Sequence, residues 1–271
     1  MRTIFSNQSE QFTFIFDLDG VIYRGWEPQP SAIETLHLLK DMGHFVRFYT
    51  NNSASSRNSY STKMAKLGFP TPPEEIMTTS YATAFYLIEQ GAVGKTVLRI
   101  GGDGIREELE AAGMHCIAGD QEPDAQPEFV VVGIDREFTY AKLARAQHAI
   151  FDGARFIATN RDSSFPIEND VIMPGAGCIV AAVQTSCGVA PYVIGKPETY
   201  AFNKILESTG SDAAHAVMVG DRLDTDILVA KNAGARSVLV LTGVNNRTDA
   251  EEAPNDLKPD FVMETLGEML I

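Results

Sequence analysis

Short, uninterrupted apolar segments recur along the whole chain, and this repetition constrains the fold more than any other feature. Eight of them are rich in β-branched and aromatic residues: 12–16, 45–49, 97–100, 129–134, 155–159, 192–194, 216–219 and 237–241. Because their apolar character is continuous and does not alternate, they predict strands buried on both faces of a parallel sheet. Helix-like patterns separate these segments, so the sequence predicts an α/β protein.

Two shifts in composition indicate that this pattern is divided into two parts. A chain of 271 residues can form one large domain or two ordinary ones, at roughly 150 residues per domain. The segments 78–83 and 184–191 are typical of hinges around an inserted α/β unit. Before the first hinge, Ser31 and Glu34 predict a capping box where a helix starts, and Gly43 predicts where that helix ends.

The charge balance argues against two classes of partner. The net charge is −14, whereas affinity for nucleic acid or for anionic membranes requires clustered Lys and Arg. A small anionic substrate remains compatible with this charge, because a local site can oppose the global sign. The polar first residues predict no signal peptide, and no segment approaches the ~18 apolar residues of a membrane span. Three cysteines without a CxxC pattern predict neither a zinc site nor a disulfide scaffold. We therefore expect a cytoplasmic protein.

Polar side chains gather where the predicted strands end. Ligands of open α/β sheets bind at the carboxyl ends of the strands, and four of these ends carry reactive groups. They are Asp17 and Asp19, then Thr50 and Asn51, then Lys196, and finally Asp221 with Asp224 and Asp226 close behind. An Asp at a strand end is often only a turn or cap residue, but the whole set predicts one site at one edge of the sheet.

This acidic cluster predicts a hard metal ion. Carboxylates so close together repel one another unless a cation lies between them, and oxygen ligands without His or Cys suit Mg²⁺. With Mg²⁺ and Lys196 present, the site can accept a dianionic phosphate despite the negative net charge. The sequence therefore predicts a Mg²⁺ site that binds small phosphorylated metabolites.

The spacing of Asp17 and Asp19 predicts two roles in one pocket, because residues i and i+2 of a strand point the same way. Asp17 is placed to attack phosphorus and form an aspartyl-phosphate. Asp19 is placed to protonate the leaving oxygen and then to activate water, which requires a pKa above the ordinary ~3.9. Thr50 and Asn51 are expected to hold phosphoryl oxygens, and Lys196 to stabilise the charge of the transferring group.

Four segments carry a family resemblance: "DLDGVIYRG", "YTNNS", "IGKP" and "GDRLDTDI". They resemble the four motifs of the haloacid dehalogenase (HAD) superfamily, and more closely those of its NagD-like, C2-capped phosphatases. The resemblance spans almost the whole chain, including "GGDGIREELEAAG", "ATNRD" and "PGAGCIVAAV". It implies a Rossmann-like parallel-sheet core, residues 1–80 and 185–271, interrupted by an α/β cap, residues 81–184.

The resemblance also implies roles for single residues. Asp17 is the nucleophile and Asp19 the acid/base. Mg²⁺ is held by the Asp17 side chain, the Asp19 carbonyl and Asp221, while Asp226 supports the metal's water shell or Lys196. The cap is implied to be mobile and to be the candidate interface of a homo-oligomer.

Two cap segments allow either a functional or a purely structural interpretation. The loop that contains Asn160, Arg161 and Asp162 is either a solvated turn or, by family analogy, a loop that selects the leaving group. The segment "GGDGIREEL" invites a dinucleotide-binding interpretation, but Glu107 stands where that motif needs its third glycine, so we favour a structural strand-to-helix turn.

We therefore predict a Mg²⁺-dependent phosphomonoester hydrolase of the HAD type. A phosphotransferase or phosphomutase with the same nucleophile is one alternative, and a non-catalytic sensor of phosphorylated metabolites is another. A nicotinamide oxidoreductase is disfavoured by the missing glycine. The residues do not distinguish phosphoglycolate, pyridoxal phosphate, sugar phosphates and nucleotide monophosphates as substrates.

Overall fold

The computed structural model describes residues 10–122, 125–166 and 172–270. The chain folds into two compact units. The first consists of Met1–Tyr49, Ser61–Met77 and Lys196–Ile271, and the second of Thr50–Tyr60 and Thr78–Gly195. The second unit thus includes residues 50–60, 78–80 and 185–195, which the sequence analysis assigned to the core. The polar first nine residues, on which the signal-peptide prediction depends, lie outside the described residues.

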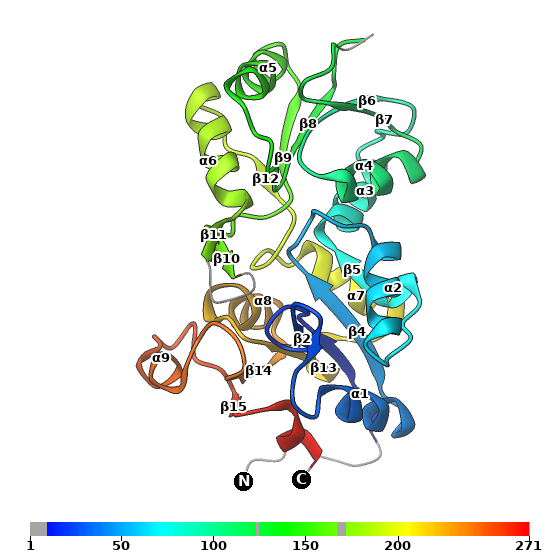
Figure 1. The fold of residues 1–271 in the computed structure, drawn as a ribbon, viewed down its shortest axis with the longest axis vertical. Helices are drawn as coiled ribbons and strands as arrows, with labels where there is room; N and C mark the ends of the chain where they lie inside the picture. Colours follow the sequence, from blue (N-terminus) through cyan, green and yellow to red (C-terminus); the bar gives the residue numbers. More distant parts are fainter. Residues whose placement is uncertain (1–9, 123–124, 167–171, 271) are drawn as a thin grey trace. The chain divides into compact units, whose positions relative to one another are not determined.

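A six-stranded sheet forms the centre of the first unit (Figure 1). Its order is β15 (Phe261–Met263), β14 (Arg236–Val240), β13 (Ala216–Gly220), β1 (Thr13–Phe16), β4 (Phe45–Thr50) and β5 (Ile76–Thr78). β1 pairs in parallel with β13 on one side and with β4 on the other. Every residue of β1 and β13 is buried, as expected for central strands covered on both faces.

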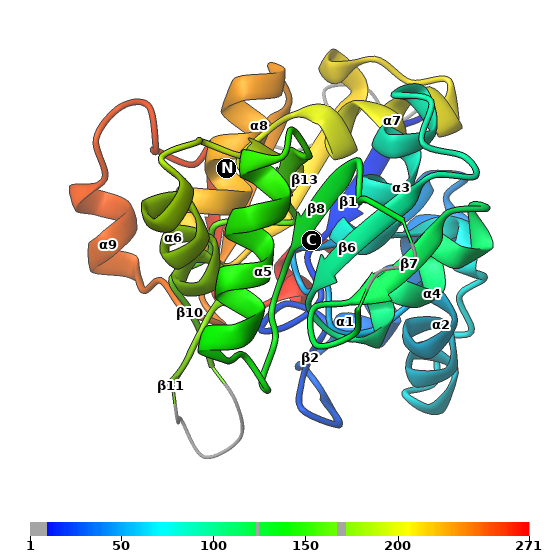
Figure 2. The same ribbon diagram turned by 90° about the horizontal axis from the view of Figure 1, so that it is seen from above.

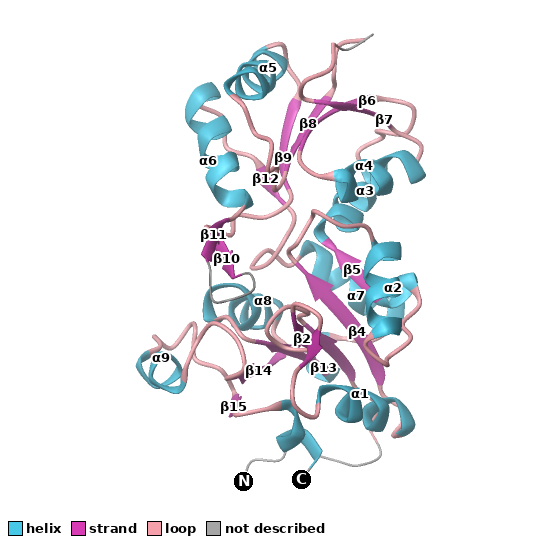
Figure 3. Ribbon diagram, viewed as in Figure 1, coloured by secondary structure: helices cyan, strands magenta, loops and turns pink. Residues whose placement is uncertain are grey.

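Helices flank this sheet and alternate with most of its strands along the chain (Figure 3). They are α1 (Ala32–Asp41), α2 (Arg57–Lys66), α7 (Tyr200–Thr209), α8 (Leu228–Ala233) and α9 (Arg247–Glu252), and a π-helical turn (Leu223–Ile227) precedes α8. A short hairpin of β2 (Tyr23–Arg24) and β3 (Glu27–Pro28) follows β1. Because β1 is parallel to both β13 and β4, the carboxyl ends of these three strands lie at the same edge of the sheet.

The second unit has its own parallel sheet of five strands, of which β6 and β8 are seen with the helices α5 and α6 in Figure 2. The order is β12 (Tyr192–Val193), β9 (Arg155–Ala158), β8 (Phe129–Val132), β6 (Thr96–Ile100) and β7 (His115–Ala118). Helix α3 (Thr79–Glu89) packs against α4 (Asp103–Ala111), and α5 (Tyr140–Phe151) packs against α6 (Ala176–Cys187). β10 (Ser164–Pro166) and β11 (Ile172–Pro174) pair antiparallel.

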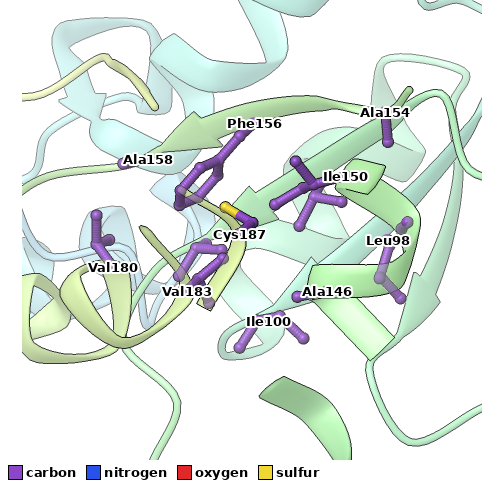
Figure 4. Packing of buried hydrophobic residues seen from close by; sticks show 13 residues of the cluster. Leu98, Ile100, Ala146, Ile150, Ala154, Phe156, Ala158, Val180, Val183 and Cys187 are labelled. Atoms are coloured by element: carbon purple, nitrogen blue, oxygen red, sulfur yellow. The ribbon is translucent and has the colours of Figure 1, made fainter. Parts of the chain in front are cut away.

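The hydrophobic core of the second unit lies between its sheet and the helices α5 and α6 (Figure 4). Val130, Val132 and Leu98 come from the strands, and Ala146 and Val183 from the two helices; all five are completely or almost completely buried. At roughly 25 cal/mol per Å² of apolar surface removed from water, such a cluster stabilises this unit independently of the first sheet.

The α/β prediction is confirmed, and all eight apolar segments form strands. Seven further strands of the described residues were not predicted, namely β2, β3, β5, β7, β10, β11 and β15, because each has only two to four residues. The predicted capping box is wrong: Ser31 has a φ of 58° and its side chain makes no capping hydrogen bond. The left-handed backbone conformation of Ser31 differs from the extended one of an ordinary N-cap, and the Ser31 carbonyl accepts from the Thr35 hydroxyl at 2.6 Å.

None of the helices formed by the described residues combines the length and the apolar character needed to cross a bilayer.

Candidate active site

Asp17 follows β1 directly, between the ends of β13 and β4. Four buried apolar or β-branched residues of β1 hold the strand inside the sheet, and the Asp17 N–H continues the ladder by donating to the Val219 carbonyl at 2.9 Å. The backbone of Asp17 is therefore fixed by the sheet, while its side chain stands at the carboxyl edge. Only 9% of the residue is exposed.

Lys196 connects two carboxylates of this edge. Its ammonium group donates to Asp17 Oδ1 and to Asp226 Oδ1, both at 2.6 Å, and to the Tyr49 carbonyl at 3.2 Å. Lys196 is 2% exposed. A charged lysine so deeply buried requires such partners, because desolvation of an unpaired ammonium group is prohibitively costly.

The structure corrects the predicted origin of Lys196. The sequence analysis placed the strand that precedes it in the same sheet as Asp17, but β12 belongs to the five-stranded sheet of the second unit. Lys196 is the residue at which the chain re-enters the first unit. Three strand ends of the first sheet and this re-entry, rather than four ends of one sheet, supply the predicted groups.

Asp17, Asp221 and Asp226 offer carboxylate oxygens within 4.8 Å of one another. Asp221 follows β13, and one of its oxygens accepts the Val244 N–H at 2.8 Å. Asp226 lies in the π-helical turn, where its second oxygen accepts the N–H groups of Asp221 and Arg222 at 3.2 and 3.1 Å. Both oxygens of Asp226 are therefore engaged by donors of the protein, and this residue holds Lys196 and the loop after β13 in place.

Burial and like charge dominate the electrostatics of this cluster. Desolvation raises the pKa of Asp17 well above its ordinary value; Lys196 opposes that shift, whereas the charges of Asp226 and Asp221 add to it. Desolvation, and then the charge of Asp226, raise the pKa of Asp221 to about 7. Burial alone would lower the pKa of Lys196, but Asp17 and Asp226 raise it above the ordinary value. The cluster thus holds one buried cation among three carboxylates, with an excess of negative charge.

Three glycines that the sequence analysis did not single out make room for these carboxylates. A Cβ on Gly20 or Gly243 would lie 2.6 or 1.9 Å from Asp221 Oδ2, and a Cβ on Gly220 would lie 2.1 Å from the Asp226 Cβ. Gly243 follows β14, so a search of every strand end of the sheet, and not only of those with charged residues, would have found it.

Asp19 differs from the cluster in its exposure, because its side chain reaches solvent. Its backbone forms a bridge with Tyr23, beside the Gly20 N–H that donates to the Tyr23 carbonyl at 2.8 Å. Desolvation by the surrounding protein still raises the pKa of Asp19, and the charges of Lys63 and Lys196 oppose that shift. The Lys63 ammonium group lies 3.4 Å from the centre of the Tyr23 ring.

Thr50 is the last residue of β4, the strand next to β1, and Asn51 follows it directly. Both are buried. The Thr50 hydroxyl accepts the Asn52 N–H at 3.1 Å, and the Asn51 amide donates to Asp162 Oδ1 at 2.9 Å.

The three predicted cap residues lie in the loop after β9 and have different environments. Asn160 is buried and donates to the Asn51 carbonyl at 2.7 Å. Arg161 is exposed and donates to Gln184 Oε1 at 2.6 Å. Asp162 is half-buried and accepts from Asn51. The structure thus brings Asn160 and Asp162 together with Asn51, whereas Arg161 is exposed and bonded to Gln184.

Comparison with known proteins identifies the family. A model of haloacid dehalogenase-like hydrolases matches residues 14–115, and one of HAD-hydrolase-like proteins matches residues 193–269. The chain is 37% identical to phosphoglycolate phosphatase 2 of Arabidopsis thaliana over 276 residues, which covers 95% of this chain and 92% of that protein.

Solved structures agree with this match. Glycerol phosphate phosphatase from Mycobacterium tuberculosis, in complex with magnesium, superposes with a TM-score of 0.87 at 32% identity, covering 97% of this chain and 77% of that one. NagD from Escherichia coli K-12 superposes with a TM-score of 0.83 at 29% identity, covering 95% and 98%. The chain therefore belongs to the haloacid dehalogenase-like hydrolases, within their NagD-like phosphatases.

Proposed function

We propose that this protein hydrolyses small phosphate monoesters in a Mg²⁺-dependent reaction that passes through an aspartyl-phosphate on Asp17. The observation that carries the proposal is the buried cluster of Asp17, Asp221 and Asp226 around the Lys196 ammonium group. A binding protein does not need a carboxylate nucleophile at this position, whereas covalent phosphoryl transfer does.

The residues of the cluster fit a magnesium ion. Their donors are all oxygens, the set preferred by hard cations. The raised pKa values of Asp17 and Asp221 show that burial and negative charge already disfavour ionisation, and a divalent cation would remove that penalty. We propose that the Asp17 and Asp221 carboxylates and the Asp19 carbonyl hold the ion, with Asp226 supporting Lys196 or the water shell of the ion. When bound, Mg²⁺ supplies electrostatic stabilisation of the transferring phosphoryl group.

The roles of the side chains follow from their positions. Asp17, fixed by the sheet at its backbone, attacks phosphorus. Asp19 reaches solvent and so is placed to protonate the leaving oxygen and then to take a proton from the hydrolytic water. Lys196 neutralises charge beside Asp17, and Thr50 and Asn51 bind phosphoryl oxygens.

The leaving group is proposed to be chosen by the second unit. Phosphoglycolate and glycerol phosphate phosphatases are both among the relatives, so similarity alone does not decide the substrate. In the loop 160–162 the exposed Arg161 is the proposed contact to the leaving group, while Asn160 and Asp162 shape the loop. The substrate class is small phosphorylated metabolites.

The test is release of 4-nitrophenol from its phosphate ester by wild type and by Asp17→Asn, with Mg²⁺ and with EDTA. Mg²⁺-dependent turnover that the substitution abolishes is the expected result, because an amide cannot form the acyl phosphate. Substantial turnover by folded Asp17→Asn would overturn the nucleophile assignment. If wild type binds phosphometabolites with Mg²⁺ but hydrolyses none of them, the sensor alternative replaces the hydrolase. Transfer to added alcohols in place of water would favour the phosphotransferase.

A further inference from the structure

The carboxyl edge of the second sheet is filled by the chain itself. In α/β sheets this edge is the usual place for a ligand, and the start of α4, after β6, has two of the three glycines of a nucleotide-binding turn. Here the Gly104 N–H donates to the Ala54 carbonyl at 3.0 Å. A Cβ on Gly104 would lie 2.5 Å from the Ser55 carbonyl carbon, and one on Gly102 would lie 3.2 Å from the Ala54 oxygen. The glycines therefore admit the backbone of residues 51–57, which we call the seated segment.

The seated segment begins with Asn51, whose backbone and side chain are both held. The Asn51 carbonyl accepts from Asn160 Nδ2 at 2.7 Å and from the Thr79 hydroxyl at 2.8 Å. The Asn51 amide donates to Asp162 Oδ1 at 2.9 Å. Gly195 lies against this group, since a Cβ there would be 2.6 Å from Asn51 Oδ1. The rotamer and the carbonyl direction of Asn51 are thus both set by residues of the second unit.

Asn160 uses both ends of its amide inside the protein. Its Nδ2 also donates to the Thr159 hydroxyl at 3.3 Å, and its Oδ1 accepts the Asp162 N–H at 3.1 Å. With 3% of the residue exposed, Asn160 links Asp162 to Asn51 instead of presenting donors to solvent.

The far end of the seated segment is held by Glu108 of α4. The Arg57 N–H donates to Glu108 Oε1 at 2.8 Å, and the Arg57 guanidinium group forms an ion pair with the same carboxylate at 3.2 Å. The guanidinium carbon also lies 3.2 Å from the centre of the Tyr81 ring. Both ends of the segment are therefore tied to the second unit.

We propose that Asn160 is a positioning residue that, together with Asp162, fixes Asn51 for phosphate binding. The proposal rests on the proposed function in one respect, namely that Asn51 contacts the phosphoryl group. Removing the Asn160 amide takes one of its donors from the buried Asn51 carbonyl. It also leaves the Asp162 backbone N–H without the oxygen that accepts from it. Asn51 and its neighbour Thr50 therefore lose their fixed geometry.

The experiment measures the affinity of inorganic phosphate, with Mg²⁺, by calorimetry. Asn160→Ala and Asp162→Ala are expected to weaken phosphate binding by about 5–20-fold, the effect of one or two buried hydrogen bonds. Asp162→Asn keeps an oxygen that can accept from Asn51, so its affinity is expected to stay within about threefold of wild type. The kcat/KM values of 4-nitrophenyl phosphate and phenyl phosphate are expected to fall by equal factors, because the defect concerns the phosphoryl group and not the leaving group.

Thr139→Ala is the matched control for loss of stability. Thr139 caps α5 by accepting the Lys142 N–H, far in sequence from the seated segment, and its loss costs about as much as a typical helix cap. It is expected to lower the unfolding midpoint of the protein without changing phosphate affinity. Unchanged phosphate affinity of Asn160→Ala, or losses that differ between the two esters, would overturn the positioning role. A wild type that binds phosphate but hydrolyses no ester would overturn only the proposed hydrolase, since the affinity comparison still decides the positioning role.

Discussion

The two parallel sheets of this protein use their carboxyl edges in opposite ways. At the edge of the first sheet, glycines at 20, 220 and 243 make room for carboxylates, and a buried lysine partly neutralises them. At the edge of the second sheet, glycines at 102, 104 and 195 make room for the backbone and the Asn51 side chain of the seated segment. Both edges are crowded, but the first is filled by ionisable groups and the second by the protein's own peptide groups.

This difference shows that the carboxyl edge of a parallel sheet does not by itself determine what binds there. The second sheet has the strand, two of the turn glycines and the helix start of a dinucleotide-binding site, yet the N–H of Gly104 donates to the Ala54 carbonyl. The first sheet has no such turn after β1, and its chemistry depends on side chains. The composition of the residues at an edge, rather than the topology that creates it, decides what the edge can bind.

Each edge also has a buried ion pair, and breaking both pairs tests the comparison most strongly. Lys196→Met leaves Asp17 and Asp226 buried without their cation. We expect the unfolding free energy to fall by about 3–5 kcal/mol and kcat/KM for 4-nitrophenyl phosphate to fall by about 10²–10³-fold. Urea unfolding and initial rates measure the two effects.

The matched variant is Lys142→Met in the second unit. Lys142 pairs with Asp135 at 2.9 Å, and both side chains are less than one-tenth exposed. Stability is expected to fall by about 2–4 kcal/mol, while kcat/KM per folded molecule stays within about twofold of wild type. Equal losses of activity in the two variants would show that the second edge takes part in the chemistry.

The second-largest expected effect is on the pH dependence of the unfolding free energy, which the carboxylates at the edge of the first sheet should dominate. The pKa of Asp221 is raised to about 7 in the folded protein, against about 3.9 in an unfolded chain. Between these values the folded state binds more protons at Asp221, so the contribution of this residue to stability is fully present below pH 4, falls as the pH rises toward 7, and levels off above it. In EDTA we expect a loss of a few kcal/mol across that window.

Asp221→Asn provides the comparison for this slope. The substitution removes the titrating group, so the fall in unfolding free energy between pH 4 and 7 should become shallower; the raised pKa of Asp17 leaves a residual slope of the same sign. Added Mg²⁺ should also reduce the slope, because a bound cation favours the ionised carboxylates. A slope that Asp221→Asn leaves unchanged would assign the titration to another group.

The sequence predicted the first edge much better than the second, for a physical reason. Ionisable residues at strand ends are conspicuous because such residues are rarely buried without a partner, so Asp17, Lys196 and Asp221 could be found from their positions alone. The packing at the second edge depends on glycines, which make room for the backbone because they have no Cβ. Gly104 reveals its role only when the Ser55 backbone is seen beside it. The assignment of β12 to the second sheet was equally hidden, since a strand does not specify its neighbour.

Gly104→Ala tests the steric part of the comparison. Alanine is favoured over glycine inside a helix by about 1 kcal/mol, but here its Cβ would overlap the Ser55 backbone at 2.5–2.7 Å. We expect a net loss of about 1–3 kcal/mol in unfolding free energy. Gly153→Ala is the control, because Gly153 has a φ of +102° and no atom within 4 Å of the added Cβ. Its cost reports backbone strain alone, about 1 kcal/mol.

Both glycine variants should also be assayed for phosphate affinity. If the seated segment positions Asn51, Gly104→Ala should weaken phosphate binding while Gly153→Ala leaves it unchanged. A Gly104→Ala protein with wild-type stability and wild-type affinity would show that the edge is not packed as described.

The smallest expected effect concerns Arg161, the exposed residue of the loop after β9. Arg161 donates to Gln184 Oε1 and makes no hydrogen bond to Asn51 among the contacts of the described residues, so Arg161→Ala should leave phosphate affinity unchanged. If it contacts the leaving group, the ranking of kcat/KM across a panel of phosphate esters should shift by about 3–10-fold, while 4-nitrophenyl phosphate changes less than about twofold. A fixed ranking would assign the choice of substrate to other residues of the second unit, and would leave its sheet edge with a purely positioning role.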